Sequence, residues 1–349
     1  AGHSFQFGIE VQPSGGTFTQ YAQFSNRIAG AQTRIYGANA IDLDGDFATD
    51  LATVNEVSGD VRVFLNLADG SGGFGAMLAP EPIGDEGSPN DAGDFDRDGD
   101  VDLCIAASSD DEVWILLGNG DGTFAPGQAV AVGQEPHGIV SFDSDGDGDT
   151  DIVNASRNSN NLALLRNDGT GVFGAPTFFE GGVDSEYGLA AGDMDSDGIL
   201  DLVVAGQGGQ HVRTTRGNGN GTFTPVGTAR NCGGQPWVVV LGDIDGDGDL
   251  DAATANTGAG TSGLLENTGA GSFAVATTVN VGGHIPSTDL GDLDGDGDLD
   301  LVVSSYGGGY WRMFRNDGTG AYAFWRDISA PSNPSCSILV DTDRDGDLD

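Results

Sequence analysis

A nine-residue Asp-rich segment recurs seven times along the chain and constrains the fold more than any other feature. Its sixth copy reads Asp292-Leu-Asp-Gly-Asp-Gly-Asp-Leu-Asp300, with carboxylates at positions 1, 3, 5 and 9 and glycine at position 6. The copies cover 42–50, 94–102, 143–151, 193–201, 243–251, 292–300 and 341–349. Their starts are 52, 49, 50, 50, 49 and 49 residues apart, and a fixed period of this size indicates a repeat architecture. We therefore expect a single closed domain over residues 1–349.

The pattern of each copy is typical of a calcium loop. Ca²⁺ takes about six to eight oxygen ligands, and alternate Asp side chains on a tight turn can supply them together with a backbone carbonyl near position 7. Glycine at position 6 permits the sharp bend. An EF-hand would need a Glu at position 12, where the sixth copy has Val303. We predict up to seven structural Ca²⁺ ions.

The predicted metal ligands are the aspartates at positions 1, 3, 5 and 9 of each loop. They are Asp42, Asp44, Asp46 and Asp50; Asp94, Asp96, Asp98 and Asp102; Asp143, Asp145, Asp147 and Asp151; Asp193, Asp195, Asp197 and Asp201; Asp243, Asp245, Asp247 and Asp251; Asp292, Asp294, Asp296 and Asp300; and Asp341, Asp343, Asp345 and Asp349.

Two loops depart from the pattern. In the first loop, position 6 is Phe47 instead of glycine, which predicts a distorted or weaker site. In the fourth loop, position 7 is Ile199, which costs nothing if only its backbone carbonyl binds the metal.

The remaining sequence between the loops predicts strands. In the repeat 134–183, short β-type runs cover 139–142, 152–155, 162–165 and 177–179, divided by turns rich in Gly, Asn and Asp. No window carries a sustained 3.6-residue apolar stripe, which argues against helices. Each repeat is therefore expected to be a four-stranded antiparallel sheet.

Seven such sheets can bury both faces by packing radially against one another. We therefore predict an all-β fold, a seven-bladed β-propeller with a calcium loop in each blade and a ring closed by N- and C-terminal strands. A hairpin such as Asn119-Gly-Asp-Gly-Thr-Phe124 recurs between the third and outer strands. Its Asn and Gly suit the positive φ of the turn, and the aromatic residue after it is expected to pack between blades.

These motifs resemble the FG-GAP/VCBS repeats, which are found in the head propellers of integrin α-subunits and in fungal lectins of the Psathyrella type. The resemblance rests on the Asp-x-Asp-x-Asp-Gly-x-x-Asp loop, the hairpin and a Pro-x-x-hydrophobic lead-in, and it covers essentially the whole chain. It implies a propeller but not one function, because the family includes adhesins, lectins and enzyme-attached modules.

The two ends of the chain predict how the ring of blades is closed. Alignment of Phe18 with Tyr322 assigns the N-terminal residues to the third and outer strands of the last blade, and the C-terminal residues to its innermost strand and loop. The counterpart of 301–304, its second strand, is missing. Either the native chain continues past Asp349, or a strand from another molecule fills the gap and permits self-assembly.

The acidic composition of the chain argues against some classes of binding partner. The formal charge is −41, with 54 acidic residues against 13 arginines and no lysine, and it stays strongly negative with every loop filled. Nucleic acid and anionic membranes are therefore poor partners, and no run is long enough to insert into a bilayer. Because cytosolic free calcium is too low to fill weak loops, we expect an extracellular or cell-surface protein, secreted and already without its signal peptide.

A candidate ligand site lies six residues before each calcium loop, at the entrance of the expected channel. Four of these seven positions carry rings, namely Tyr36, His137, Tyr187 and Trp237. Aromatic planes there suit stacking on a sugar or anchoring a protein, and the alternative is that they plug the channel.

No catalytic residues are predicted, since the chain shows neither a nucleophile turn nor a metal-type histidine spacing. We expect a non-catalytic, calcium-stabilised propeller for binding or adhesion, whose partner is a glycan or an extracellular protein. The alternatives are a structural subunit of an extracellular polymer and a carbohydrate-active enzyme of polysaccharide-lyase type, built on His137 and Tyr187.

Overall fold

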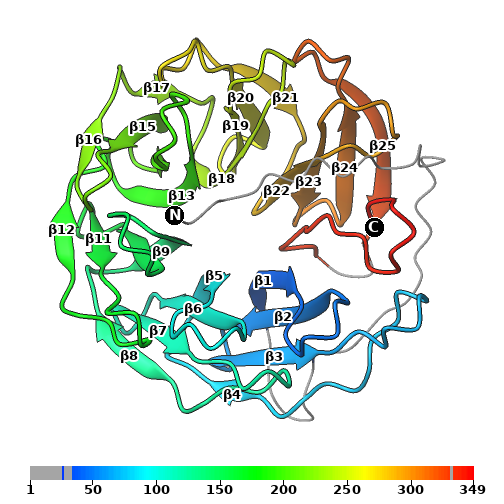
Figure 1. Cartoon of the computed structure of the whole chain (residues 1–349). Helices are drawn as coiled ribbons and strands as arrows, with labels where there is room; N and C mark the ends of the chain where they lie inside the picture. The colour runs from blue at the N-terminus through cyan, green and yellow to red at the C-terminus, as the bar shows by residue number, and fades with distance from the viewer. Residues whose placement is uncertain (1–25, 27–33, 331–332) are drawn as a thin grey trace.

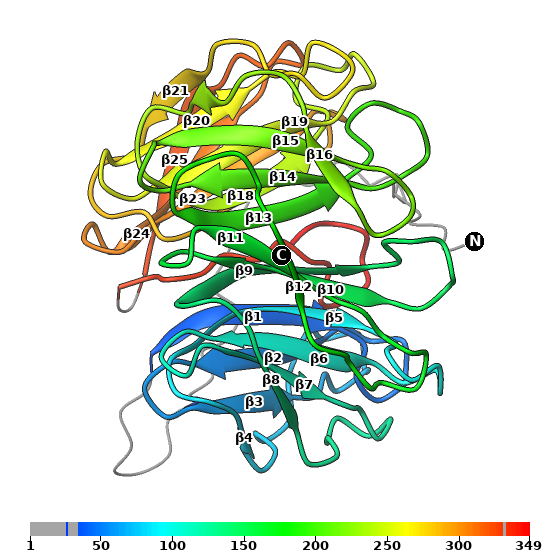
Figure 2. The ribbon, with the colours of Figure 1, turned by 90° about the vertical axis from the view of Figure 1, so that its left-hand side faces the viewer.

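The computed structural model describes residue 26 and residues 34–330 and 333–349. In these residues the chain forms β-sheets arranged around a central axis, and Figure 1 shows them in chain order around the ring. Figure 2 shows the same ring from the side, with loops projecting at both ends of the sheets. Within this described part, no helix is long and apolar enough to cross a membrane.

Each sheet is one repeat, a meander from the innermost to the outermost strand. The first has β1 (Ile35–Ile41), β2 (Asp50–Asn55), β3 (Asp60–Phe64) and β4 (Glu81–Pro82). The second has β5 (Gly87–Gly93), β6 (Asp102–Ala107), β7 (Glu112–Leu116) and β8 (Gln128–Ala131). The third has β9 (Pro136–Phe142), β10 (Asp151–Ser156), β11 (Asn161–Leu165) and β12 (Thr177–Phe179). The fourth has β13 (Glu186–Gly192), β14 (Asp201–Gly206), β15 (His211–Gly217), β16 (Phe223–Pro225) and β17 (Arg230–Asn231). The fifth has β18 (Pro236–Gly242), β19 (Asp251–Asn256), β20 (Thr261–Leu265) and β21 (Thr277–Asn280), and the sixth has β22 (Thr288–Gly291), β23 (Asp300–Ser305), β24 (Tyr310–Arg315) and β25 (Ala323–Ser329).

The core lies between neighbouring sheets. The second strands β6, β10, β14, β19 and β23 are buried along their whole length, because a neighbouring sheet or, on one face of β23, the segment 333–349 covers them. One apolar cluster joins Val54 and Val61 of the first sheet to Leu103 and Ile105 of the second, and similar clusters join the following pairs. The hairpin aromatics pack in these clusters as predicted, with Phe173 and Phe273 buried.

The prediction of seven blades is wrong, because the described residues form six sheets. A blade requires a ladder of hydrogen bonds between strands, and the seventh loop belongs to a segment, 333–349, that has no strand partner among the described residues. The predicted N-terminal strands of that blade fall in residues 1–25, outside the described part of the chain.

The C-terminal segment 333–349 nevertheless lies between the sixth and first sheets (Figure 1). Leu339 and Leu348 pack against the apolar cluster of the sixth sheet, and the Leu339 N–H donates to Asp289 at 3.0 Å. On the other side, Asn66 of the first sheet donates from Nδ2 to the Thr342 carbonyl at 2.9 Å. The segment therefore links the last sheet to the first.

The hairpin asparagine has a role that its turn pattern does not predict. Asn167 donates from Nδ2 both to the carbonyl of Thr150, in its own loop, and to that of Phe95, in the preceding loop. Asn267 and Asn316 repeat the pair of bonds two and three loops further along. The bonds of these asparagines tie the third, fifth and sixth Asp-rich loops to the loop that precedes each of them.

Candidate metal centres and ligand-binding site

Each of the first six Asp-rich loops connects the innermost strand of a sheet to its second strand. The first carboxylate holds the turn closed: in the third loop, Asp143 accepts hydrogen bonds from Gly146 N at 2.7 Å and Gly148 N at 3.0 Å. Gly148, at position 6, has a φ of 90°, in the left-handed region that favours glycine. The sequence therefore folds these loops locally, through bonds between residues three to five apart.

Phe47 adopts the same conformation at position 6 of the first loop, with a φ of 66°. Its N–H still donates to Asp42 at 2.8 Å, as the glycine does in the third to sixth loops, so the turn closes despite the strained backbone. In the fourth loop, Ile199 donates its N–H to Asp197 at 2.9 Å, and its side chain is not needed for the turn.

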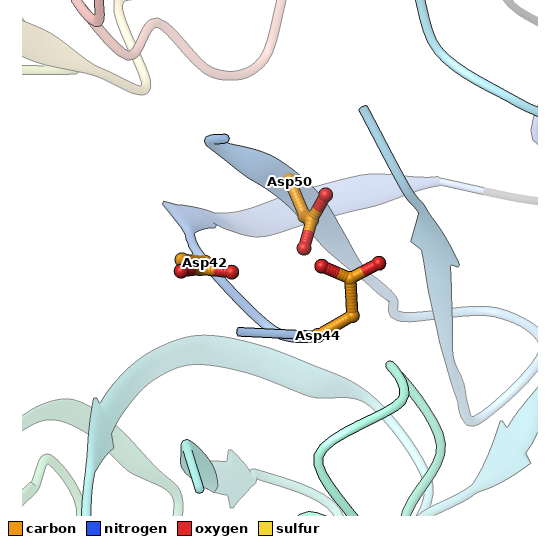
Figure 3. Close-up of side chains that lie close together, drawn as sticks. All are labelled: Asp42, Asp44 and Asp50. Carbon is orange, nitrogen blue, oxygen red and sulfur yellow. The ribbon is translucent and has the colours of Figure 1, made fainter. Parts of the chain in front are cut away.

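The loops bring carboxylates together. In the first loop, oxygens of Asp42, Asp44 and Asp50 lie within 4.8 Å of one another, and Figure 3 shows these side chains converging across the hairpin. The same holds for Asp94, Asp96 and Asp102 in the second loop and for Asp243, Asp245 and Asp251 in the fifth. In the third and fourth loops, the carboxylates at positions 1, 3 and 5 converge instead. These oxygen-only clusters have the donor chemistry that Ca²⁺ prefers.

Unpartnered oxygens show that the clusters fit a cation. Three position-3 aspartates, Asp145, Asp195 and Asp294, each have a buried Oδ1 without a hydrogen-bond partner. The Asp195 side chain is only 9% exposed, so water does not reach this oxygen freely. A buried carboxylate oxygen without a donor is costly, and a divalent cation would satisfy it. Bound Ca²⁺ would supply charge neutralisation and cross-linking of the loop.

The position-9 aspartates have a second role beside the predicted one. Asp251 is fully buried and accepts from Ile244 N at 2.9 Å through one oxygen and from Asn267 N at 2.6 Å through the other. Asp102, Asp201 and Asp300 make the same pair of bonds. Burial raises the pKa of these carboxyls to about 6, although their hydrogen bonds oppose that shift. The position-9 aspartate therefore links its loop, through hydrogen bonds, to the end of the third strand.

At the opposite end of the sheets, the four predicted ring residues come together. Tyr36, His137, Tyr187 and Trp237 lie at the starts of β1, β9, β13 and β18. The rings of His137 and Tyr187 stack with centroids 4.0 Å apart, and Tyr187 stacks on Trp237 at 5.5 Å. Tyr36 approaches Trp237 at 6.4 Å from the first sheet. The innermost strands thus place these rings against one another. This contact also fits the alternative in which the rings plug the channel.

Two residues that sequence reasoning missed extend this group. His284 packs edge-on to Trp237 at 4.9 Å, and Tyr306 lies 6.0 Å from His284. Neither occupies the repeat position that identified the other four, so only their spatial proximity reveals them. We call Tyr36, His137, Tyr187, Trp237, His284 and Tyr306 the aromatic cluster.

Polar atoms of the aromatic cluster lack partners. His137 Nδ1 and Trp237 Nε1 are buried without a hydrogen-bond partner. Burial, and then the charge of Arg157, lowers the pKa of His137 to about 3, so its imidazole is neutral at physiological pH. Arg157 itself pairs with Glu135 at 2.6 Å. The cluster therefore combines apolar planes with polar atoms and a charged pair beside them.

A polar pocket opens near Trp237 on the same end of the sheets. It has a volume of about 340 Å³ and is lined by Gln210, Gly233, Gly234, Gln235, Gly258 and Ala259. These residues belong to the β14–β15 and β19–β20 turns and to the segment before β18. The turns and blade connections of this face thus shape a recess of about the size that a small polar ligand needs.

Glu186, next to Tyr187, is a buried acid with one satisfied oxygen. Its Oε1 accepts from Gly181 N at 2.9 Å, while Oε2 has no partner. Burial, together with the nearby Glu180 and Asp184, raises its pKa to about 7. Since the folded-state pKa exceeds the ordinary value of 4.5, folding favours the neutral form. The contribution of Glu186 to stability is full below about pH 4.5 and is lost as pH rises through 7.

We therefore expect Glu186→Gln to stabilise the protein at pH 8 by roughly 2–3 kcal/mol and to have little effect at pH 4.5. Thermal unfolding over this pH range, with the unsubstituted protein measured in parallel, gives the change in stability. If Glu186→Gln changed the stability equally at both pH values, ionisation of Glu186 would not be what lowers the stability at pH 8.

The comparisons with known proteins agree with this geometry. The family model described as the FG-GAP-like repeat matches residues 42–105, 94–153, 143–204, 193–254 and 292–349, which together are more than half of the chain. The chain belongs to the FG-GAP-like repeat family. Each match begins at an Asp-rich loop and runs through the following loop, so the family unit is offset from the observed sheet, which begins one strand earlier. No curated protein matches the sequence.

Solved structures confirm the propeller fold of this FG-GAP-like chain. An Agrocybe aegerita lectin that recognises non-reducing terminal N-acetylglucosamine is 19% identical, with a TM-score of 0.57 over 88% of this chain and 83% of the lectin. A periplasmic gluconolactonase of Pseudomonas aeruginosa is 17% identical, with a TM-score of 0.62 over 86% of each chain. A virginiamycin B lyase of Staphylococcus aureus is 13% identical, with a TM-score of 0.58 over 85% and 86%. These likenesses show the fold alone.

Proposed function

We propose that this FG-GAP-like propeller is an extracellular, calcium-stabilised binding protein that recognises a glycan through its aromatic cluster, without catalysis. One observation carries the proposal: Tyr187 and Trp237 stack at the end of the sheets while His137 Nδ1 and Trp237 Nε1 remain unpartnered. A pyranose offers apolar C–H faces to such rings and hydroxyls to such atoms.

The positions of the two kinds of site support separate roles. The Asp-rich loops join first to second strands, whereas the aromatic cluster lies at the other end of the sheets, at or before the starts of first strands and, for Tyr306, just after the second strand β23. Calcium would therefore act from a distance, by holding the blades, and would not bridge the ligand. The Agrocybe aegerita lectin is a precedent for sugar recognition on a propeller of similar fold.

Glycan-array binding tests the proposal. We expect Trp237→Ala to weaken binding of the best-bound glycan by roughly 10- to 100-fold, because a buried aromatic anchor carries a large share of binding energy. Phe178→Ala is the matched control, since Phe178 is a half-exposed ring on the outer strand β12. Binding that Trp237→Ala leaves intact would overturn the site. Absence of glycan binding together with capture of an extracellular protein would favour the adhesion alternative.

The enzyme alternative has one supporting observation. His137, Tyr187 and Arg157 lie together, with the guanidinium 5.9 Å from the Tyr187 ring centroid. A lyase would need Tyr187 or His137 to exchange a proton near neutral pH. Burial raises the pKa of Tyr187 and lowers that of His137, so both groups are poorly matched to that task. Unsaturated sugar products after incubation with acidic polysaccharides would establish the enzyme, and filaments in solution would establish the polymer subunit.

A further inference from the structure

The carboxylate at position 3 of the Asp-rich loops is held in two different ways. In the third, fourth and sixth loops, an arginine at the end of the third strand binds Oδ2 of this aspartate, and Oδ1 is left buried and unpartnered. Arg216 binds Asp195 at 3.2 Å and Arg315 binds Asp294 at 3.0 Å. Arg166 and Asp145 form the third pair.

Loops without this arginine hold the same carboxylate from the backbone. Asp96 accepts from the N–H of Asp98 at 3.2 Å, and Asp245 accepts from that of Asp247 at 3.2 Å. Asp44 makes the same bond in the first loop, at 3.3 Å. Among the described residues, the three arginine loops lack this bond from position 5. In the arginine loops the guanidinium binds Oδ2, and Oδ1, the oxygen that a backbone N–H binds in the other loops, is left without a donor.

The strand position that carries the arginine is variable. It lies 21 residues after the position-3 aspartate, and in the first, second and fifth loops it is Leu65, Leu117 and Glu266. The predicted metal centres therefore differ in nearby charge while their own aspartates stay similar. In the fourth loop a positive group contacts the cluster, whereas the fifth loop has a negative residue at the same place.

We propose that Arg166, Arg216 and Arg315 are built-in counter-ions that let their loops close without metal and that lower the affinity of these loops for Ca²⁺. The proposal rests on the calcium role given above. It divides the metal centres of one ring into two classes, a weak class with an arginine on the position-3 aspartate and a strong class without one there.

Electrostatics determines the direction of both effects. Without metal, each loop holds four or five aspartates in mutual repulsion, and one guanidinium offsets part of it. With metal, the same guanidinium repels the divalent cation across a single carboxylate. Arg216 is 47% exposed, so water and salt screen the interaction without removing it. Calcium affinity depends on the charge around the site, so the arginine loops should release the ion first as free calcium falls.

A reciprocal exchange between neighbouring loops tests the proposal. Arg216 and Glu266 both lie at exposed positions at the ends of third strands, so either substitution should leave the core unchanged. The variants are Arg216→Glu, Glu266→Arg and the charge-conserving double exchange, with Arg216→Gln as the milder form. Arg312→Gln is the control, because Arg312 forms an ion pair with Asp327 on the outer strand β25, away from the loops.

Two readouts separate a counter-ion from a merely structural residue. Isothermal titration with Ca²⁺ at low ionic strength should show one class of sites tightened roughly 10-fold or more by Arg216→Glu, and one class weakened to a similar extent by Glu266→Arg. In chelator, Arg216→Glu should lower the unfolding temperature and Glu266→Arg should raise it. A structural arginine would instead lower the unfolding temperature equally with and without calcium.

Each other outcome overturns a specific statement. Weaker or unchanged calcium binding in both Arg216→Gln and Arg216→Glu would refute the counter-ion role while leaving the calcium role in place. Absence of calcium binding by the unmodified protein would refute the calcium role and, with it, the two classes.

Discussion

Removal of calcium should lower the unfolding temperature of this protein by about 5–15 °C. Metal that binds only the folded state stabilises it by linkage. For extracellular-type dissociation constants at millimolar calcium, that amounts to roughly 0.4–1.4 kcal/mol for each occupied loop. The carboxylates at positions 1, 3 and 5 or 9 converge in each named cluster, so several loops should contribute together.

The measurement is thermal unfolding in millimolar Ca²⁺ and in EGTA, with Mg²⁺ present in both samples so that only calcium differs. Light scattering on the same samples separates loss of internal stability from loss of assembly. A midpoint that is the same in both buffers would mean that the loops close without metal, and the calcium role would be wrong. Large assemblies that dissolve in EGTA would make calcium a link between molecules.

Asp251→Ala should destabilise the protein by about 3–5 kcal/mol, the largest effect that we expect from one substitution. Asp251 is completely buried and holds the N–H groups of Ile244 and Asn267. Its removal leaves two buried donors without an acceptor, and each costs roughly 1–3 kcal/mol. In calcium, the loss of a predicted ligand adds to this cost.

Asp249→Ala is the matched control in the same loop. Asp249 has the same charge, but its side chain is partly exposed instead of buried, and the fourth loop has Ile199 at this position. We expect a change in the free energy of unfolding below about 1 kcal/mol for this variant. Denaturant unfolding of both variants, in calcium and in chelator, compares the two carboxylates directly. Equal losses for the two would show that position 9 acts through charge alone and not through its hydrogen bonds.

Much of one blade could be predicted from the sequence. The runs expected at 152–155, 162–165 and 177–179 correspond to β10, β11 and β12, each within one residue at either end. Alternation, turn residues and the loop motif are short-range signals, and each is satisfied within a single repeat. The convergence of carboxylates is local in the same sense, because positions 1 to 9 are joined by one tight turn.

The number of blades could not be obtained in this way. Seven loops predicted seven blades, but a sheet forms only where a second strand pairs with the first, and 333–349 lacks that partner among the described residues. A motif count reports the loops, whereas strand pairing is a long-range property of the folded chain.

Only some residues of the aromatic cluster could be predicted from the sequence. The repeat position identified Tyr36, His137, Tyr187 and Trp237, because equivalent residues of a ring lie at the same height on its inner strands. His284 and Tyr306 occupy other repeat positions and join the cluster only through packing across sheets.

The sequence by itself therefore determined the repeat, the Asp-rich loops and the order of strands within a sheet, because hydrogen bonds and turns between near neighbours encode them. Only the tertiary structure decided which side chains of different strands and sheets meet. It placed Arg216 on Asp195, Asn167 on the preceding loop and His284 on Trp237. Those contacts depend on how six twisted sheets pack around one axis, and no local pattern of residues carries that information.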